Sequence, residues 1–301
     1  MGTLAGSADP VTMTCVGEPP AAEFVAGALF QVERRTTIGR LASPLELRSE
    51  AFAALSRASD LVAMEIPWAW QRCLPDGTQW RMPAWVSQEI MATDRAPIVL
   101  PAPLRKEARR LERRHGYELH FSTHEVDVRR FHATLYRPYV AARFGNGAVI
   151  VDERQFLAVS RHMTLAVLTS AGEWVAGLLL QRRAATLHFG WFGSASMPLR
   201  SGASEVLDAR VLQWAARNNV RRVVMGHSRP SLADGVVRYK RRFGAAVRPT
   251  RFPQRTLGLL VQNWSPPLVA ALDAAQFVAF RDGQLEVFRP ENPSPPGRAG
   301  A

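Results

Sequence analysis

The sequence has little of what metal sites and disulfide frameworks require. It contains two cysteines, Cys15 and Cys73, and seven histidines with no paired spacing such as HExxH. A structural zinc site takes four Cys or His ligands in closely spaced pairs, and a disulfide framework takes more than two cysteines. We therefore expect no metal, and we expect the chain to be cytoplasmic, where thiols stay reduced.

Long apolar runs are missing as well. The longest candidate, residues 165–180, is interrupted by Gly172 and Glu173 and is shorter than the ~20 residues that cross a bilayer. The N-terminus shows no basic stretch followed by an apolar core, so we expect no secretory signal. These observations predict a protein without integral membrane contact.

Lysine is scarce, because Lys106 and Lys240 are the only lysines among the 38 basic residues. An excess of arginine is typical of a GC-rich coding sequence, so the net charge of +12 is weak evidence for a polyanionic partner. The charge is uneven, however: residues 104–262 hold 27 basic and 11 acidic side chains. A negatively charged partner would therefore meet the middle of the chain, although each dense basic run by itself is explained as a solvated helix face.

The composition is that of a folded protein, since 47% of the residues are hydrophobic and 21% are charged. Such a balance excludes a disordered chain. Residues 1–22 and 290–301 are rich in small residues and proline, and we expect both ends to be disordered. Between them we distinguish an N-terminal part over 23–103, a main domain over 104–262, and a C-terminal helix and hairpin over 263–289.

Hydrophobic periodicity and turn signals predict the elements. Helices are expected over 44–59, 104–114, 127–143, 152–162, 203–217 and 234–243, and strands over 117–122, 163–169, 174–182, 186–192, 220–225 and 251–262. The tryptophans between residues 68 and 85 are interpreted as core, with an aromatic binding wall as the alternative. The first strands form a hairpin and a later pair is joined by a helix, so the predicted class is α/β, of the α+β kind with a mixed sheet.

The segment 226–244 carries the strongest functional signal. It begins where a buried strand ends and a helix opens, which is where α/β sheets place ligands. On a helical projection Lys240 shares the buried arc with Tyr239 and Phe243, opposite Arg241 and Arg242. Two interpretations of Lys240 are open. Its stem lies on apolar surface and its ammonium reaches water, or its ammonium is the compact cation that a narrow cleft requires to bind a phosphate or an oxyanion.

This segment resembles a known family. The run RYKRRFG over 238–244, preceded by MGHS over 225–228 and WAAR over 214–217, is similar to the C-terminal half of the GNAT-fold acyltransferases related to the Fem peptidyltransferases. In that group a strand ending in Gly-x-Ser leads to a helix with a Phe/Tyr-Lys-x-x-Phe-Gly signature. The resemblance covers residues 104–262 and implies a GNAT-like fold, with the part before it as a reduced first lobe.

The resemblance implies transfer of an acyl group to an amine of a small or nucleotide-linked acceptor, with acyl-CoA as the favoured donor. The sequence departs from the Gln/Arg-x-x-Gly-x-Gly/Ala pattern of acetyl-CoA users, because residues 199–203 read LRSGA. An aminoacyl-tRNA donor is therefore an alternative, in a peptidyltransferase of bacterial cell-envelope precursor synthesis. A third hypothesis is that the chain is a non-enzymatic basic module that binds RNA or DNA.

Three residues are the candidates for catalysis within this resemblance. Lys240 would stabilise a phosphate or the tetrahedral oxyanion. His227 and Ser228, at the end of a strand, would relay or position the proton of the amine. Asp234 is expected to cap the following helix instead.

Six further residues are predicted to bind the donor or the acceptor: Gly202, Ala203, Arg241, Arg242, Trp191 and Ser194. Gly202 and Ala203 begin a helix whose amides would meet a donor phosphate, and the two arginines would assist Lys240 at the rim. Trp191 and Ser194 would line the acceptor pocket, although core packing explains Trp191 nearly as well.

Overall fold

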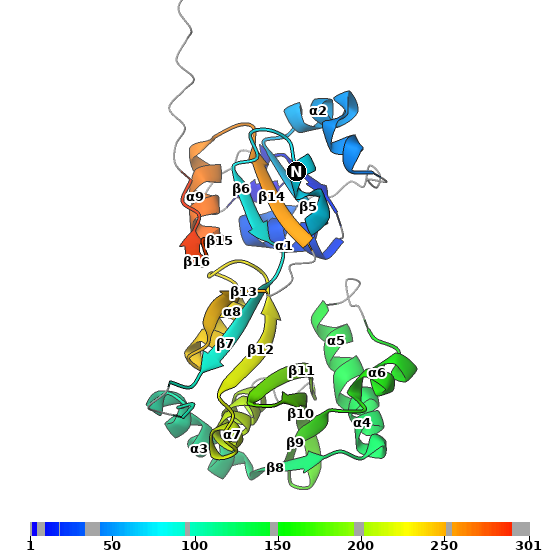
Figure 1. Cartoon of the computed structure of the whole chain (residues 1–301), viewed down its shortest axis with the longest axis vertical. Helices are drawn as coiled ribbons and strands as arrows, with labels where there is room; N and C mark the ends of the chain where they lie inside the picture. The colour runs from blue at the N-terminus through cyan, green and yellow to red at the C-terminus, as the bar shows by residue number, and fades with distance from the viewer. Residues whose placement is uncertain are drawn as a thin grey trace, which may run out of the picture. The chain divides into compact units, whose positions relative to one another are not determined.

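The computed structural model of the chain describes residues 2–4, 10–17, 19–33, 43–93, 97–144, 150–195, 202–250 and 255–290. The chain forms two compact units (Figure 1). The first comprises Met1–Val86, His227–Arg238 and Val247–Ala301, and the second comprises Ser87–Gly226 and Tyr239–Ala246. The units do not follow the predicted division at residues 103 and 262, because the first unit takes chain from both ends and from the middle of the sequence.

The first unit is built on a four-stranded sheet in the order β3-β5-β14-β6. Its strands are β3 (Met13–Val16), β5 (Leu61–Pro67), β14 (Arg255–Val261) and β6 (Trp80–Pro83). Strand β3 is parallel to β5, and the other neighbours are antiparallel. The remaining elements are β1 (Gly2–Leu4), β2 (Pro10–Val11), α1 (Pro19–Leu29), β4 (Phe30–Glu33), η1 (Pro44–Arg48), α2 (Glu50–Arg57), η2 (Trp68–Cys73), α9 (Pro266–Ala275), β15 (Val278–Arg281) and β16 (Gln284–Val287).

Several expectations for this unit need correction. Residues 1–22, expected to be disordered, contribute β1, β2, β3 and the start of α1, because β3 pairs in register with the buried strand β5. The helix expected over 44–59 is divided into η1 and α2, since the hydroxyl of Ser49 accepts a hydrogen bond from the amide of Phe52 and starts a new helix. Trp80 is buried in the core, as expected, whereas Trp68 and Trp85 are exposed.

The C-terminal part of the sequence was predicted more closely. Helix α9 and the hairpin β15–β16 correspond to the helix and hairpin expected over 263–289. The tail expected over 290–301 lies outside the described residues, apart from Pro290.

A seven-stranded sheet, in the order β13-β7-β12-β11-β10-β9-β8, contains the strands of the second unit. They are β7 (Val86–Met91), β8 (Tyr117–Ser122), β9 (Thr164–Ser170), β10 (Glu173–Arg183), β11 (Thr186–Ser194) and β12 (Arg222–Ser228), together with the first residue of β13 (Ala246–Pro249), whose other residues are assigned to the first unit. Strands β8 to β11 are antiparallel neighbours, whereas β11 and β12 are parallel and joined by the helix α7 (Ala203–Arg217). The predicted mixed α/β class is thus confirmed. Strands β7 and β13 were not predicted.

Helices cover both faces of this sheet (Figure 1). Helices α3 (Ala102–His115) and α7 share one core with Ala166 and Leu168 of β9. The intervening residues Leu165 and Val167 belong to a second core. That core includes α4 (Glu125–Phe131), η3 (His132–Tyr136), α5 (Arg137–Phe144) and α6 (Glu153–Ser160). The alternation follows from the two-residue period of a strand.

The helix expected over 127–143 contains a π-helical turn, η3. This turn lies against β11 at Gly193, where an added Cβ would stand 2.6 Å from the backbone nitrogen of Tyr136. Only a residue without a side chain permits this approach of two backbones.

Gly193→Ala is therefore expected to lower the free energy of unfolding by about 1–3 kcal/mol, the usual cost of overpacking a core. Urea unfolding followed by circular dichroism measures it. Gly27→Ala in α1 serves as the matched control, because nothing lies within 4 Å of its added Cβ. Replacing a helical glycine by alanine stabilises by about 0.5–1 kcal/mol, so the two substitutions should have opposite signs.

Candidate functional site

The parallel ladder between β11 and β12 is short. Registered pairs join Thr186–His188 to Arg222–Val224, and none follows in these two fully described strands, although β11 continues to Ser194. Just beyond the last pair, Gly226 of β12 has a φ of 79°, which an L side chain rarely adopts. The two strands therefore separate toward their carboxyl ends. In open α/β sheets, ligands bind in a crevice at this end of the strands.

The side chain of Lys240, from the helix α8 (Gly235–Arg242), reaches this point. A Cβ added to Gly226 would stand 3.8 Å from the Nζ of Lys240 and 3.8 Å from the carbonyl oxygen of Phe189 in β11. The ammonium thus lies beside both strand ends. Lys240 is partly buried, and its neighbours Tyr239 and Phe243 pack in the core of the second unit, as the helical arc predicted.

A buried carboxylate on α7 faces the same helix. Asp208 is 7% exposed, and the hydroxyl of Tyr239 donates a hydrogen bond of 2.8 Å to its Oδ2. Burial raises the pKa of Asp208 to about 7, against the opposing effects of this hydrogen bond and of the positive charge of Lys240. Burial, together with the charge of Asp208, also raises the pKa of Tyr239.

Sequence reasoning did not single out Asp208 or Tyr239 as functional residues. A signal was present, because Asp208 interrupts the apolar run of Val206, Leu207 and Ala209, all of which are buried. An acidic residue within the buried stretch of a helix requires a partner. That rule would have marked Asp208 but would not have identified its partner.

The predicted donor-binding residues Gly202 and Ala203 begin α7. Gly202 is the N-cap in a left-handed conformation, and an added Cβ there would stand 2.6 Å from Cδ1 of Leu111 in α3. The hydroxyl of Ser204 is buried and has no hydrogen-bond partner among the described residues. The amides of this first turn lack intrahelical acceptors, which suits them to an anion. Residues 199–201 of the expected donor loop lie outside the described residues.

Arg241 and Arg242 end α8 on its exposed side. Arg242 forms an ion pair of 2.7 Å with Glu205 in the first turn of α7. This pairing offsets a negative charge that would otherwise oppose an anion at the helix start. Arg241 is exposed.

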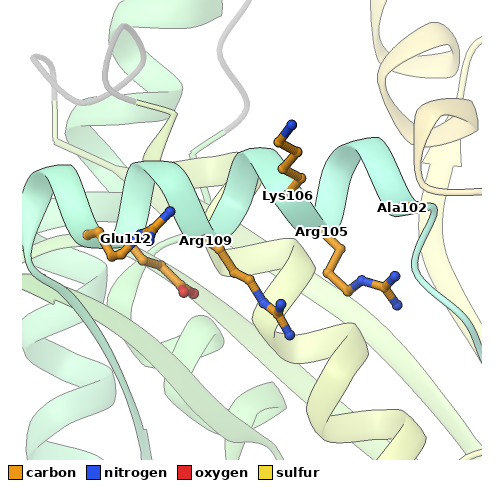
Figure 2. Close-up of a pocket in the computed structure, with 6 residues that line it drawn as sticks. Ala102, Arg105, Lys106, Arg109 and Glu112 are labelled. Atoms are coloured by element: carbon orange, nitrogen blue, oxygen red, sulfur yellow. The ribbon is translucent and has the colours of Figure 1, made fainter.

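The exposed face of α3 is strongly basic. Ala102, Arg105, Lys106, Arg109, Glu112 and Arg113 line a surface hollow of about 480 Å³. Figure 2 shows Arg105 and Arg109 extending from the same side of the helix, with Lys106 extending from the other. The nearby acids are already paired, since Glu112 binds Arg210 at 2.9 Å and Glu107 binds Arg110 at 2.6 Å. The positive charge of this hollow is therefore available to a ligand.

The basic face of α3 is electrostatically linked to the end of α8. A hydrogen bond from Arg110 lowers the pKa of Glu107 most, and the charge of Arg242 contributes in the same direction. Both arginines and Glu107 belong to the second unit. The basic surface of α3 and the surroundings of Lys240 thus belong to one unit.

His227 and Ser228 occupy the end of β12, as predicted, and belong to the first unit, whereas Lys240 belongs to the second. His227 is exposed and Ser228 is buried. Their catalytic roles stay predictions. The expected cap is confirmed, because Oδ1 of Asp234 accepts hydrogen bonds from the amides of Val236 and Val237.

Trp191 and Ser194 lie at the end of β11. Trp191 stacks on Phe156 with ring centroids 4.4 Å apart and packs in the core on the opposite face from Tyr239. The hydroxyl of Ser194 is buried and donates to the carbonyl of Ala195. Core packing thus accounts for Trp191, and a contact of either residue with an acceptor stays a prediction.

No three His, Cys, Asp or Glu side chains of the described ranges are grouped so as to hold a metal ion. None of the described helices is long and apolar enough to cross a membrane.

None of the protein-family models and none of the curated proteins matches this sequence. Among solved structures, the chain is similar to L-PGS from Bacillus licheniformis, with a TM-score of 0.41, 17% identity, and coverage of 76% of this chain and 77% of that chain. For FemX the TM-score is 0.43 and the sequence identity is 9%, and the match covers 77% of this chain and 81% of that chain. For a GCN5-related N-acetyltransferase from Sphaerobacter thermophilus the TM-score is 0.39 and the sequence identity is 16%, and the match covers 69% of this chain and 62% of that chain. The chain is thus similar in structure, at low sequence identity, to a GNAT-type acetyltransferase and to FemX.

Proposed function

We propose that this chain is an N-acyltransferase, which moves an acyl group from an activated donor to an amine of a small or nucleotide-linked acceptor. Acyl-CoA is the favoured donor. One observation carries the proposal: the Nζ of Lys240 and the carbonyl of Phe189 each lie 3.8 Å from the Cβ position of Gly226. A cation at the ends of two diverging strands is placed to meet negative charge that develops on a donor.

The chemistry proposed for this site is direct transfer. The acceptor nitrogen attacks the carbonyl carbon of the thioester, and the carbonyl oxygen becomes an oxyanion that the Lys240 ammonium stabilises. When the C–S bond breaks, the thiolate leaves and takes up the proton released by the nitrogen. The backbone of β11 beyond His188 would hold the extended donor, and the first turn of α7 would meet its phosphates.

The donor is tested by thermal shift with acetyl-CoA, longer acyl-CoAs and charged tRNA. A ligand at a hundred times its Kd adds about 2.7 kcal/mol to the stability of the state that binds it, which raises Tm by about 4 °C for a chain of 301 residues. We expect this shift with an acyl-CoA. A shift with charged tRNA and none with any acyl-CoA would contradict the favoured donor.

A second donor class is supported by the basic hollow on α3. Arg105, Arg109 and Arg113 follow one another at four-residue spacing, so they recur every ~6 Å along the helix axis. Such a row matches the phosphate backbone of an RNA. The alternative proposal is therefore an aminoacyl-tRNA-dependent transferase, in which α3 holds the RNA and Lys240 meets the ester.

Replacing Arg105, Arg109 and Arg113 together by Gln discriminates between these donors. If RNA binds at α3, the triple variant should bind tRNA more weakly, and the slope of log K against log salt should become less steep by about 2–3. Filter binding across a salt series measures both. A control variant with Arg161, Arg183 and Arg217 replaced by Gln loses the same charge from exposed sites of the same unit, so an equal effect of both variants would reject α3 as the RNA site.

A further inference from the structure

The seven-stranded sheet ends at β8 (Figure 1). This strand pairs with β9 along its whole length, from Tyr117 to Ser122, and no other described strand pairs with its second edge. An edge strand presents a row of backbone donors and acceptors to any strand that can pair with it. The helices before and after β8, α3 and α4, belong to the same unit as β8.

The backbone of Leu119 faces the free edge of β8. The carbonyl oxygen of Glu118 accepts a hydrogen bond of 3.4 Å from the hydroxyl of Thr169 in β9, so the backbone groups of Glu118 point toward β9. Successive residues of an antiparallel strand alternate between the two sides. The N–H and C=O groups of Leu119 therefore point away from β9, where a second strand can bond to both.

The sequence of β8 is complementary to itself when it is read in the opposite direction. Glu118 and His120 flank Leu119 on one face of the strand, and their side chains are 74% and 58% exposed. A two-fold axis through Leu119 places Glu118 of each copy opposite His120 of the other. These residues form a non-hydrogen-bonded pair, in which side chains are closest, and the carboxylate accepts a hydrogen bond from the imidazole. Axes through Glu118 or His120 would place identical side chains opposite each other.

The helix ends on either side of β8 carry complementary charges as well. Helix α3 ends just before the strand with the exposed Arg113 and Arg114, and α4 begins just after it with the exposed Glu125. In the same two-fold register, the end of α3 in one copy approaches the start of α4 in the other. Glu125 also pairs with Arg129 of its own chain at 2.8 Å, but both side chains stay exposed. Basic and acidic groups therefore meet at both ends of the paired strands.

Two large apolar side chains at this edge are exposed. Phe121 is 38% exposed and Val126 is 70% exposed. One neighbour of Phe121 is Trp214 of α7, with ring centroids 5.2 Å apart. The two-fold register adds Tyr117 of the second copy as a cross-strand neighbour, and aromatic cross-strand pairs stabilise a sheet.

We propose that a second copy of this chain pairs with the free edge of β8, in an antiparallel, two-fold symmetric register centred on Leu119. The seven-stranded sheets of the two copies then join into one continuous sheet. The contact is confined to a strand of six residues and the adjoining helix ends, so it belongs to the small class of specific interfaces. We therefore expect a dimer with a micromolar Kd. This inference does not depend on the proposed function.

Sedimentation velocity of the full chain tests the association, over a concentration series from about 1 to 200 µM. We expect the mass to rise with concentration from 33.3 kDa toward twice this value. A mass that stays at that of one chain over the whole series would overturn the proposal. The free edge of β8 would then be left to a strand of another protein.

Charge variants test whether β8 is the surface that associates. His120→Glu places two acids opposite each other at both symmetric positions, and like charges in that position are destabilising, so Kd should rise about tenfold or more. Glu118→His combined with His120→Glu exchanges the two side chains and restores the complementarity, so its Kd should return to within about threefold of the wild type. The matched control, His162→Glu, changes an exposed histidine of the same unit and should leave Kd unchanged.

Circular dichroism checks that these variants are folded. If His120→Glu formed the dimer as tightly as the wild type, the contact would lie elsewhere on the molecule. If the exchanged double variant associated as weakly as His120→Glu, the proposed register would be wrong.

Cross-linking tests the register without relying on charge. In a background with Cys15→Ser and Cys73→Ser, the variants Glu118→Cys and His120→Cys are prepared separately, one with an affinity tag, and then mixed under mild oxidation. The two positions lie opposite each other with Cα atoms about 4.5 Å apart, a separation that a disulfide spans. We expect linked dimers mainly between the two different variants, and none when Val99→Cys, which alters an exposed residue of the same unit, replaces His120→Cys. Linked dimers no more abundant in the mixture than in either variant alone would reject the register.

Discussion

Lys240→Ala is expected to lower kcat about 10²–10³-fold, the effect of removing one group that stabilises an oxyanion. The loss follows from the position of Nζ beside Gly226 and Phe189, which no other lysine of the chain shares. The fold should persist, because Lys240 is partly exposed. Release of free CoA, or transfer from charged tRNA, measures the rate, and circular dichroism checks the fold.

Lys240→Arg tests the same site more sharply. A guanidinium keeps the charge but is wider and planar, so the variant should recover little activity. Lys106→Arg is the matched control, since Lys106 is exposed on α3, and it should turn over at the wild-type rate. Full activity of Lys240→Arg would reject the need for a compact ammonium.

The non-enzymatic reading predicts another pattern for these variants. A module that only binds RNA or DNA should lose one charge contact in Lys240→Ala, which lowers its salt slope by about one. It should show no transfer from either donor. A salt slope lowered by about one in Lys240→Ala, together with no transfer from either donor, would replace the transferase proposal with nucleic-acid binding.

Glu65→Gln is expected to cause the largest loss of stability, about 3–5 kcal/mol in the free energy of unfolding of the first unit. Glu65 is 4% exposed in β5. Its Oε1 lies 3.1 Å from Nε of Arg255, and its Oε2 lies 3.6 Å from Nη1 of Arg229. Removing the acid leaves two guanidiniums without the charge that balances them, one of which is stacked over Trp85 at 4.1 Å.

Urea unfolding followed by tryptophan fluorescence measures this loss. Glu50→Gln is the matched control, because Glu50 forms an exposed ion pair of 2.6 Å with Arg57, and exposed pairs contribute only about 0–1 kcal/mol. If Glu65→Gln destabilised no more than Glu50→Gln, the buried ion pairs would not be a main support of the first unit.

Elements defined by local signals were predicted well. The bounds of α7 and β8 agree with the predicted ranges 203–217 and 117–122, because glycine, asparagine and periodicity mark their ends within the segment itself. The pairing of β3 with β5 joins residues such as Met13 and Leu61 that lie far apart in the sequence. No local pattern encodes such a partner, and for this reason the composition of the first unit was not predicted.

The same distinction applies to the candidate site. The helical arc and the strand end identified Lys240, since both are properties of the segment 226–244. The partner of Tyr239 lies 31 residues earlier, on α7, so only the fold could bring Asp208 to it. The residues that bear charge were visible in the sequence, whereas the hydrogen bond that couples them was not.

The brevity of the β11–β12 ladder has a consequence for solvent exchange. Three registered residue pairs join the antiparallel strands β8–β11 to β12, so amide protons along the far half of β11 that face β12 should exchange with deuterium faster than those of β9 and β10. An extended donor lying along that edge would slow their exchange. Comparing deuterium uptake with and without a donor would therefore locate the donor-binding residues without requiring knowledge of the product.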